Sequence, residues 1–575
     1  MADPLLALHR AFEGAISAAF GAEHASTDPA IRRSSRADYQ ANAAMALGKR
    51  LGRPPRDVAA EILENLRVDD MCTSVEIAGP GFFNISLRDD YVARELADTA
   101  KDGRLGVTPA TEPETVVVDY SSPNVAKEMH VGHLRSTILG DALARVLEAL
   151  GHRVIRQNHV GDWGTPFGML IEHLLDQDAQ GPLGLSASDL NAFYKAARAK
   201  FDADPAFAER ARARVVLLQG GDEATLAEWR RLVAASTRYF AVIYGRLGVS
   251  LTEGDLAGES LYNRMLPEVA ADLEKLDLAR ISEGALCVFP PGFTGREGEP
   301  LPLIVRKQDG GYGYAATDLA AIRHRTGALG ARRLVYVVGS PQAQHLGMVY
   351  AVARLAGWLV PPARAEHVAF GSILGADKKM FKTRSGDTVR LSDLLDEADE
   401  RAARVIAEKN PELGPEERAR IAHAVGAGAI KYADLSNDRI KDYVFDWDRM
   451  LAFEGNTAPY LMYAHARIRS IFRKAEGEGC AGAIAVVAPK ERALALELLR
   501  FGSVVREVGD TLQPHKLCAY LFELATAFTA FYEACPVLRA ASDEERRSRL
   551  AMCELVARVL ATGLGLLGIE APDRM

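Results

Sequence analysis

The sequence predicts an α/β protein built around a parallel sheet, with a small α+β domain before the sheet and a helical bundle after it. Residues 115–120 (TVVVDY) form a short β-branched run typical of a buried parallel strand. A helical pattern over residues 131–150 and a second apolar run over 153–158 follow, which gives strand–helix–strand. From about residue 415 onward nearly every segment is helical and rich in Ala, Leu and Arg. The middle of the chain is therefore predicted to be a Rossmann-type, doubly wound nucleotide-binding domain.

The first 112 residues are expected to form the α+β domain. Helical periodicity runs through residues 5–20 and 42–66, and a strand-like stretch over 74–87 is interrupted by Gly-Pro-Gly. Residues 108–113 are rich in Pro, Thr and Glu and are typical of a linker. The predicted domains are residues 1–112, residues 113–447 (the parallel-sheet domain with its insertions) and residues 448–575 (the helical bundle).

The parallel-sheet domain is expected to be interrupted by helices and then resumed. Residues 170–255 are helix-rich. Short apolar runs over 334–338 and 368–374 resume the sheet, with a helix over 343–355 between them. We see no internal repeat and no low-complexity segment.

Composition indicates a cytoplasmic multidomain protein. The chain has 575 residues, of which 48% are hydrophobic and 25% charged, and its formal net charge is −8. Its six cysteines are scattered without a CxxC pair, which argues against a disulfide framework or a zinc knuckle. The first residues lack the layout of a signal peptide, and no apolar run approaches the length of a membrane span. A nucleic-acid partner would need a local basic face, because the overall charge is mildly negative.

Two histidines, His130 and His133, stand at the turn between the first predicted strand and its helix. Three residues apart at a helix start, they share one face, and the free backbone N–H groups and positive end of the helix favour phosphate. Gly132 between them has no Cβ, so a base or ribose can approach the backbone. A pair of surface or zinc-binding histidines is the alternative. The segment HVGH resembles the HIGH signature with which class I aminoacyl-tRNA synthetases bind ATP.

Residues 379–383 read KMFKT and follow the apolar run 368–374. Lysines on a mobile loop can reach phosphate oxygens and neutralise charge as pyrophosphate leaves. The segment is similar to the KMSKS signature of the same class, which assigns Lys379, Met380 and Lys382 to ATP binding. A basic solvated loop is the alternative for this pentapeptide alone. Both signatures occur in the right order, about 250 residues apart, so the chain is identified as a member of class I.

Longer segments resemble one family within this class, the arginyl-tRNA synthetases. They are residues 121–130 (SSPNVAKEMH), 158–165 (NHVGDWGT), 455–467 (GNTAPYLMYAHAR) and 565–575 (GLLGIEAPDRM). The resemblance covers essentially the whole chain. It implies the reaction of arginine with ATP to give arginyl-adenylate and pyrophosphate, followed by transfer to the 2′-hydroxyl of the terminal adenosine of tRNA(Arg).

The residues suit a guanidinium, which is planar, always charged and rich in donors, so that its pocket needs carboxylates and oriented acceptors. Tyr314 and Asp318 lie four residues apart and share one face if their segment is helical. The resemblance places both on the guanidinium, with Glu259 as a second carboxylate. Surface charge is the alternative for the two carboxylates, and Tyr314 could equally be a core aromatic. The positions that match contacts to the two ends of arginine are Asp119, Asn124 and Gln342.

Two positions depart from the family pattern. Many arginyl enzymes lack the first KMSKS lysine and use a lysine just ahead of HIGH. This chain has Lys127 there as well as Lys379 and Lys382, so which of the three stabilises the phosphates stays open. Gly339 stands where an acidic or polar residue is expected, which predicts a locally different loop.

Two basic segments are candidate tRNA surfaces. Residues 49–56 and 467–474 both carry clusters of Lys and Arg, the second beside tyrosines that could stack on bases. Charge runs are usually solvated faces. The resemblance assigns the N-terminal domain to the tRNA elbow and the bundle to the anticodon. The candidate tRNA contacts are Arg53, Arg56, Tyr460, Arg467 and Arg469.

The resemblance also implies ATP and Mg²⁺ as cofactors without a protein-held metal site, L-arginine and tRNA(Arg) as partners, and a monomer. Activation of arginine is expected to require bound tRNA. Residues 165–310 are too few to hold a hydrolytic editing domain beside the connecting elements. Two alternatives stay open: another class I synthetase, of which the cysteinyl enzyme would need a Cys/His zinc set, and a non-catalytic amino-acid sensor or tRNA-binding module.

Overall fold

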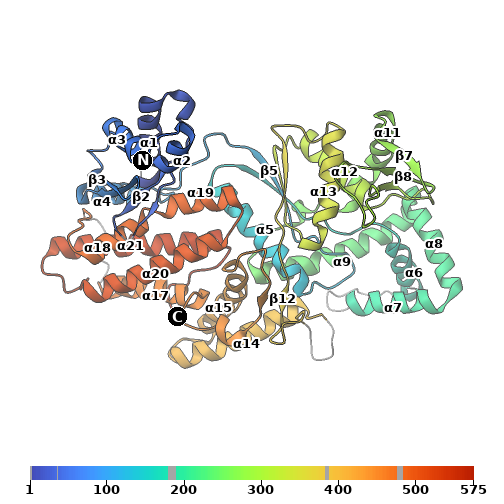
Figure 1. Cartoon of the computed structure of the whole chain (residues 1–575). Helices are drawn as coiled ribbons and strands as arrows, with labels where there is room; N and C mark the ends of the chain where they lie inside the picture. Colours follow the sequence, from blue (N-terminus) through green and yellow to red (C-terminus); the bar gives the residue numbers. More distant parts are fainter. Residues whose placement is uncertain (1–2, 35, 179–189, 382–387, 476–482) are drawn as a thin grey trace.

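A four-stranded parallel sheet lies at the centre of the molecule, a computed structural model that describes residues 3–34, 36–178, 190–381, 388–475 and 483–575 (Figure 1). Its strands run in the order β11-β10-β5-β6. The strand order reverses between β5 and β10, and ligands of open α/β sheets bind at such a switch point. The predicted fold class is confirmed. The strands are β5 (Thr115–Asp119), β6 (Arg153–Gln157), β10 (Arg333–Tyr336) and β11 (Arg364–His367).

The predicted strand over residues 368–374 is wrong in its position. The sheet strand β11 ends at His367. Beyond it the chain makes one isolated bridge to Gly339 and then forms β12 (Ile373–Leu374), which pairs with β13 (Tyr443–Val444) outside the sheet. The apolar run instead marks residues such as Val368 and Ile373, which are buried in the core. Burial alone does not distinguish a strand from a packed loop.

The N-terminal α+β region is a four-stranded antiparallel sheet of order β1-β2-β4-β3, packed with helices. The predicted helix over 42–66 is two helices, because Gly52 adopts a left-handed conformation (φ 66°) and two prolines follow it. The predicted strand over 74–87 is a hairpin. The elements are α1 (Pro4–Phe20), β1 (Arg32–Arg33), β2 (Tyr39–Ala41), α2 (Ala43–Leu51), α3 (Pro55–Asn65), β3 (Cys72–Ala78), β4 (Phe82–Leu87) and α4 (Asp89–Lys101).

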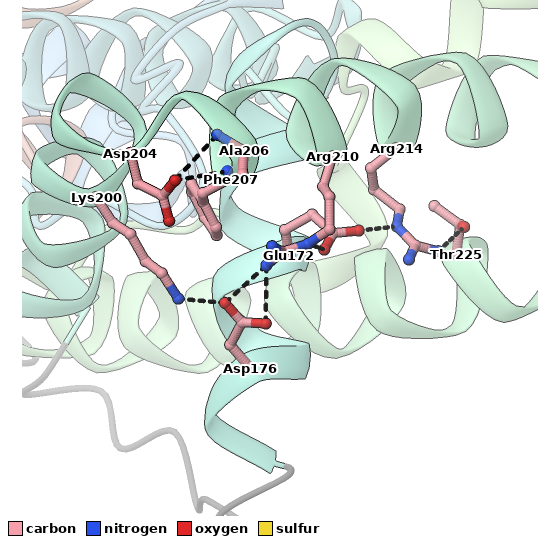
Figure 2. Close-up of polar contacts among 9 residues, drawn as sticks. All are labelled: Glu172, Asp176, Lys200, Asp204, Ala206, Phe207, Arg210, Arg214 and Thr225. Atoms are coloured by element: carbon pink, nitrogen blue, oxygen red, sulfur yellow. Dashed lines mark hydrogen bonds and ion pairs between the residues drawn. The ribbon is translucent and has the colours of Figure 1, made fainter.

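A helical insertion follows β6 and extends away from the sheet (Figure 1). It consists of α6 (Pro166–Asp178), α7 (Leu190–Ala203), α8 (Pro205–Gly220) and α9 (Glu223–Leu247). Figure 2 shows how carboxylates of α6 hold its neighbours together.

Glu172 accepts from Arg210 (3.1 Å) and Arg214 (2.7 Å) of α8. Asp176 accepts from Lys200 of α7 and from Arg210 (3.0 Å). Arg214 also donates to Thr225 at the start of α9 (2.9 Å), so one network ties all four helices.

A second module lies between the insertion and the next sheet strand. It packs a three-stranded antiparallel sheet and three helices around a second hydrophobic core, which it shares with β5 and β10 of the central sheet. Its elements, with the sheet helix that follows β10, are α10 (Glu259–Tyr262), α11 (Leu266–Lys275), β7 (Ala279–Ser282), β8 (Ala285–Val288), β9 (Leu303–Arg306), α12 (Tyr314–Gly327) and α13 (Ala343–Leu355). The expected helix over 343–355 matches α13.

The C-terminal part is helical, as predicted, and the N-terminal region packs against it (Figure 1). Arg492 of this part donates to Asp38 (2.7 Å) and Asp89 (2.7 Å) of the N-terminal region. Among the described residues, no helix is both long and apolar enough to cross a membrane. The helices are α14 (Leu391–Lys409), α15 (Pro415–Leu435), α16 (Trp447–Met450), α17 (Ala458–Lys474), α18 (Pro489–Leu498), α19 (Phe501–Thr511), α20 (His515–Ala534) and α21 (Asp543–Leu566).

A buried lysine joins the insertion to the C-terminal helices. Lys431 of α15 is 1% exposed, and its ammonium donates to the carbonyls of Leu247 (2.7 Å) and Gly568 (2.6 Å). Burial lowers the pKa of Lys431 to about 8, partly offset by the nearby carboxylate of Asp141. These two carbonyls follow the last turns of α9 and α21, so one side chain fixes both helix ends to α15.

Candidate active site

The two signature histidines open helix α5 (Val131–Ala149), at the carboxyl end of β5. His130 is the N-cap residue, and its Nδ1 accepts from the backbone N–H of Gly132 (3.1 Å). The Nδ1 of His133 accepts from the backbone N–H of His130 (3.1 Å). A Cβ at position 132 would lie 2.7 Å from Cε1 of His130, so any residue other than glycine would displace the imidazole ring.

Both histidines are neutral hydrogen-bond donors. Burial lowers the pKa of His130, and burial together with His130 lowers that of His133 to about 3. Because both Nδ1 atoms accept hydrogen bonds, the ring proton of each neutral imidazole sits on Nε2. The start of α5 thus presents two imidazole N–H groups together with its helix dipole, an arrangement suited to phosphate oxygens.

The second signature lies on a loop that leads back to the first. Lys379 and Met380 are exposed, and the backbone N–H of Gly375 donates to the Lys379 carbonyl (2.8 Å). Phe381, which replaces the middle serine of the signature, stacks on Phe445 with ring centroids 4.7 Å apart. Lys382 lies outside the described residues.

After this loop, residues 389–391 run antiparallel to the segment that ends in the signature histidines. The backbone N–H of Val131 donates to Val389 (3.0 Å), and that of Leu391 donates to Met129 (3.0 Å). The chain that follows the second signature is therefore paired with the start of α5, where the histidines lie.

A cavity of about 770 Å³ beside α5 brings four of the predicted residues together. It lies between the turn after β5, the start of the insertion and the module of β7 to β9. Lys127 extends over the ring of Tyr194, with its ammonium 4.4 Å from the centroid. The predicted residues that line the cavity are Asn124, Lys127, Glu259 and Tyr314.

One end of the cavity is acidic. Burial and the nearby carboxylates of Asp162 and Asp318 raise the pKa of Glu259 to about 7. Asp162 is held by the backbone N–H (2.9 Å) and hydroxyl (2.6 Å) of Ser260. Asp318 lies one turn after Tyr314 on α12, which confirms the predicted helix, and contacts His345 Nε2 (2.6 Å). Glu259 therefore lines the cavity within electrostatic range of two further carboxylates, which favours a cationic ligand.

Three predicted arginine contacts lie outside the residues that line this cavity: Asp318, which lies behind it beside Glu259, and the more distant Gln342 and Asp119. Gln342 is exposed just before α13. Asp119 is 6% exposed and accepts from Arg325 (2.7 Å), a fully buried residue that also donates to Gln157 (2.6 Å). Gly339 has a φ of −57°, which any residue can adopt, so its identity is not imposed by the backbone.

The residues that the sequence analysis missed act on the predicted ones. Asp162 contributes to the acidic end, His345 contacts Asp318, and Arg325 pairs with Asp119. Asp162 lies within the segment 158–165 that carries the family resemblance, which was a usable signal. His345 and Arg325 meet their partners only through the fold, and no local pattern marks them.

The candidate tRNA contacts differ in whether their side chains already have partners within the protein. Arg53 is exposed and forms a bidentate pair with Glu61. Arg56 donates to a backbone carbonyl of the β3–β4 turn (3.2 Å). On the bundle, Tyr460 packs against Phe522, with centroids 5.7 Å apart.

The guanidinium of Arg469 donates to the carboxylate of Glu554 (2.8 Å). Arg467 lies 4.5 Å from the ring centroid of Tyr532 in a groove of about 590 Å³. This groove is predominantly basic and also contains the exposed ring of Tyr463. Its charged lining residues are Glu412, Glu417, Arg467, Arg473, Lys474 and Arg574.

Comparison with known proteins covers the whole chain. Three family models match: the Arginyl tRNA synthetase N terminal domain at residues 6–87, the catalytic domain of tRNA synthetases class I (R) at 96–447, and the DALR anticodon binding domain at 461–575. A relative from Thermobifida fusca, named Arginine--tRNA ligase, is 59% identical over 100% of both chains. One of the same name from Synechococcus elongatus is 51% identical over 100% of both chains.

Solved structures give the same result. The arginyl-tRNA synthetase of Plasmodium falciparum superposes with a TM-score of 0.86 at 29% identity, covering 99% of each chain. That of Thermus thermophilus gives a TM-score of 0.83 at 29% identity, covering 99% of this chain and 100% of the other.

Proposed function

The chain belongs to the arginyl-tRNA synthetase family of class I, and on this premise we propose that the cavity beside α5 binds arginine and that the start of α5 binds ATP. It is a ligase that activates arginine with ATP and aminoacylates tRNA(Arg). The observation that carries the assignment of the cavity is its acidic end, where the pKa of Glu259 is raised to about 7 beside Asp162 and Asp318. A guanidinium, which is planar and always charged, is the cationic group that suits these carboxylates.

In the proposed first step, a carboxylate oxygen of arginine attacks the α-phosphorus of ATP. The new P–O bond forms as the bond from the α-phosphorus to the bridging oxygen breaks, and pyrophosphate leaves with the electron pair. No covalent enzyme intermediate is needed, so the protein acts by alignment and by stabilising charge. The Nε2–H groups of His130 and His133 donate to phosphate oxygens. Lys127, Lys379 and Lys382 neutralise the departing pyrophosphate.

In the second step, the terminal 2′-hydroxyl of tRNA(Arg) attacks the carbonyl carbon of the adenylate. The ester bond forms, AMP leaves, and the hydroxyl proton passes to the departing phosphate group. Neutral imidazoles suit both steps because they donate hydrogen bonds without carrying a positive charge. They therefore do not compete with the guanidinium for the carboxylates of the arginine pocket.

Within that pocket, Glu259 and Asp318 accept from the guanidinium and Tyr314 covers it. The neighbouring Asn124 supports a contact to the amino-acid end, since it lines the same cavity nearer to α5. Asp119 and Gln342 are kept as proposed contacts of the α-amino and carboxylate groups. For Asp119 this requires its carboxylate to accept hydrogen bonds from Arg325 and from the ligand at the same time.

Mg²⁺ is proposed to enter with the nucleotide. The described residues contain no group of three or more His, Cys, Asp or Glu side chains that could hold a metal ion. Mg²⁺ is commonly bound through substrate phosphates and few protein ligands, so the ion would be held mainly by ATP and would offset phosphate charge there. No step above depends on a protein-held ion.

The tRNA is proposed to contact both ends of the chain. The N-terminal domain (residues 1–112), with Arg53 and Arg56, is assigned to the elbow, and the bundle (residues 448–575) to the anticodon. The basic groove with Arg467 and Tyr463 supports the second assignment, because it combines cations with an exposed aromatic ring. Tyr460 and Arg469 are kept as proposed contacts, although both already have protein partners. The catalytic domain is residues 113–447, and we propose a cytoplasmic monomer.

The test is aminoacylation by the purified full-length chain. We expect charging of tRNA(Arg) with arginine but not with lysine or ornithine, and ATP–pyrophosphate exchange only when arginine and tRNA(Arg) are both present. His133→Ala should slow exchange strongly, whereas His9→Asn on the distant helix α1 serves as the matched control. Failure to charge tRNA(Arg), or charging it equally well with another amino acid, refutes the function. Strong exchange without tRNA refutes only the tRNA requirement.

A further inference from the structure

The segment between β5 and the signature histidines has an unusual backbone. Ser121, Ser122 and Ala126 have φ angles of 72°, 49° and 60°. Residues other than glycine rarely adopt this left-handed region, and they keep it only where the surrounding structure stabilises it. This segment also carries Asn124 and Lys127, which line the proposed arginine cavity.

Helix α9 of the insertion supplies that stabilisation. The hydroxyl of Ser236 accepts from the backbone N–H of Ala126 (2.9 Å), and that of Tyr239 accepts from the N–H of Met129 (3.2 Å). One turn further along, Tyr244 contacts the hydroxyl of Ser121 (2.7 Å). Three side chains of one helix therefore hold the segment at three successive points.

The contact of Tyr244 belongs to a chain of hydrogen bonds that ends at a signature histidine. The amide of Asn158 donates to the Tyr244 hydroxyl (2.9 Å), which lies 2.7 Å from Ser121. The hydroxyls of Ser121 and Thr137 are 2.9 Å apart, and Thr137 lies 2.8 Å from the carbonyl of His133. The amide can only donate and the carbonyl can only accept.

Each hydroxyl in this chain carries one proton. The single proton of Thr137 is donated to Ser121 or to the carbonyl of His133. In both cases contacts of 2.7–2.9 Å link Tyr244 through Ser121 and Thr137 to the first turn of α5. Burial raises the pKa of Tyr244 to about 12, so the phenol keeps its proton.

Helix α9 is itself fixed at both ends. Near its start, Thr225 accepts from Arg214 in the network that joins the four insertion helices (Figure 2). At its end, the carbonyl of Leu247 accepts from the buried ammonium of Lys431. A helix anchored twice can hold a strained turn in place, whereas a free helix would move with it.

We propose that Tyr244 is a positioning residue for the adenylation step, which it serves by holding the turn after β5 and, through Ser121 and Thr137, the first turn of α5. It touches no substrate. The proposal rests on the proposed function, since it assumes that this segment aligns arginine and ATP. It goes further in assigning to the insertion a role inside the catalytic site.

The test is a double-mutant cycle in the full-length enzyme, read by arginine-dependent ATP–pyrophosphate exchange with tRNA(Arg) present. Tyr244→Phe and Ser121→Ala should each lower kcat by about tenfold, because each breaks the same chain. The KM for ATP should rise by about threefold at most, less than kcat falls, because Lys379 of the signature loop lies on another element and still binds the nucleotide when the start of α5 is misaligned. The double variant should be about as slow as the slower single variant, because the two residues act through one contact.

Tyr520→Phe is the matched control. Its hydroxyl is equally buried and donates to the Glu497 carbonyl (3.0 Å) in the C-terminal bundle, so its loss should lower Tm without lowering kcat. The proposal is overturned if Tyr244→Phe keeps kcat within about twofold of the wild type, or if the losses of the two variants multiply.

Should Tyr244→Phe fail to fold, Ser121→Ala alone decides, and normal kcat in that variant overturns the proposal. Charging of tRNA(Arg) by the wild type is measured first. Its absence would count against the function, whereas a result on the cycle bears on Tyr244 alone.

Discussion

The acidic end of the cavity predicts that arginine binds less tightly at low pH. The pKa of Glu259 is raised to about 7 in the free enzyme, and the guanidinium pairs with its ionised form. Below that pKa the carboxyl group must lose a proton before arginine can bind. Because affinity then falls with the ionised fraction, arginine should bind about tenfold more weakly at about pH 6 than at about pH 8.

The same reasoning gives a proton count. At about pH 7 close to half of the Glu259 carboxyl groups are protonated, so binding should release about half a proton per arginine. Titration calorimetry in two buffers of different ionisation enthalpy measures this release directly. The KM for arginine, at saturating ATP and tRNA(Arg), supplies the pH profile.

Variants separate the two groups that titrate in this range. Glu259→Gln should bind arginine weakly and lose most of the pH dependence. His345 beside Asp318 also has a raised pKa, so any remaining slope in Glu259→Gln should disappear in the double variant with His345→Asn. A flat profile in the wild type, or an unchanged slope and proton release in Glu259→Gln, would refute the assignment of the acidic end to the guanidinium.

Four further predictions concern the same site. Lys382→Ala should slow arginine activation by about 10²–10³-fold with little change in arginine affinity, and a normal adenylation rate with weaker binding would make the loop a binding element. Asp318→Ala should lower kcat/KM for arginine by about 10²-fold or more, because the guanidinium loses its counter-charge; near-normal kcat/KM would show that it is read elsewhere. Glu259→Gln should raise Tm of the ligand-free enzyme at about pH 8 by about 1–2 °C, since a carboxyl whose folded pKa is raised destabilises the fold once ionised; an unchanged or lower Tm contradicts this. The wild type should leave mischarged tRNA(Arg) intact, and rapid deacylation would reveal an editing activity.

The fold was predictable wherever a pattern was local and periodic. The β-branched run over 115–120 and the helical repeat over 131–150 became β5 and α5 with nearly the expected bounds. The run over 368–374 predicted a sheet strand in the wrong position, because side chains buried in a packed loop are as apolar as those of a strand. The predicted helix over 42–66 is divided at Gly52 and the prolines that follow it. These residues signal a break, but the helical periodicity continues across them, and a prediction from periodicity alone therefore misses the break.

The site was predictable only where its residues are close in sequence. His130, Gly132 and His133 form one helix start, and their mutual hydrogen bonds follow from three-residue spacing. The acidic end combines segments far apart in the chain, and only the family resemblance pointed to two of its three carboxylates. No local pattern distinguishes Tyr244 from the other aromatic residues of α9, since its role depends on a turn more than a hundred residues earlier.

The buried ammonium of Lys431 has a consequence for how the protein is made on the ribosome. One of its two acceptors, the carbonyl of Gly568, is synthesised 137 residues after Lys431 itself. Until that residue has left the exit tunnel, burying the ammonium would leave it with one of its two protein acceptors, which is costly, so the junction stays open to water. The nascent chain therefore completes this junction, and with it the anchor of α9, only after residue 568 has been made. A chain released before residue 568 would be left with an unstable catalytic half and exposed to proteolysis.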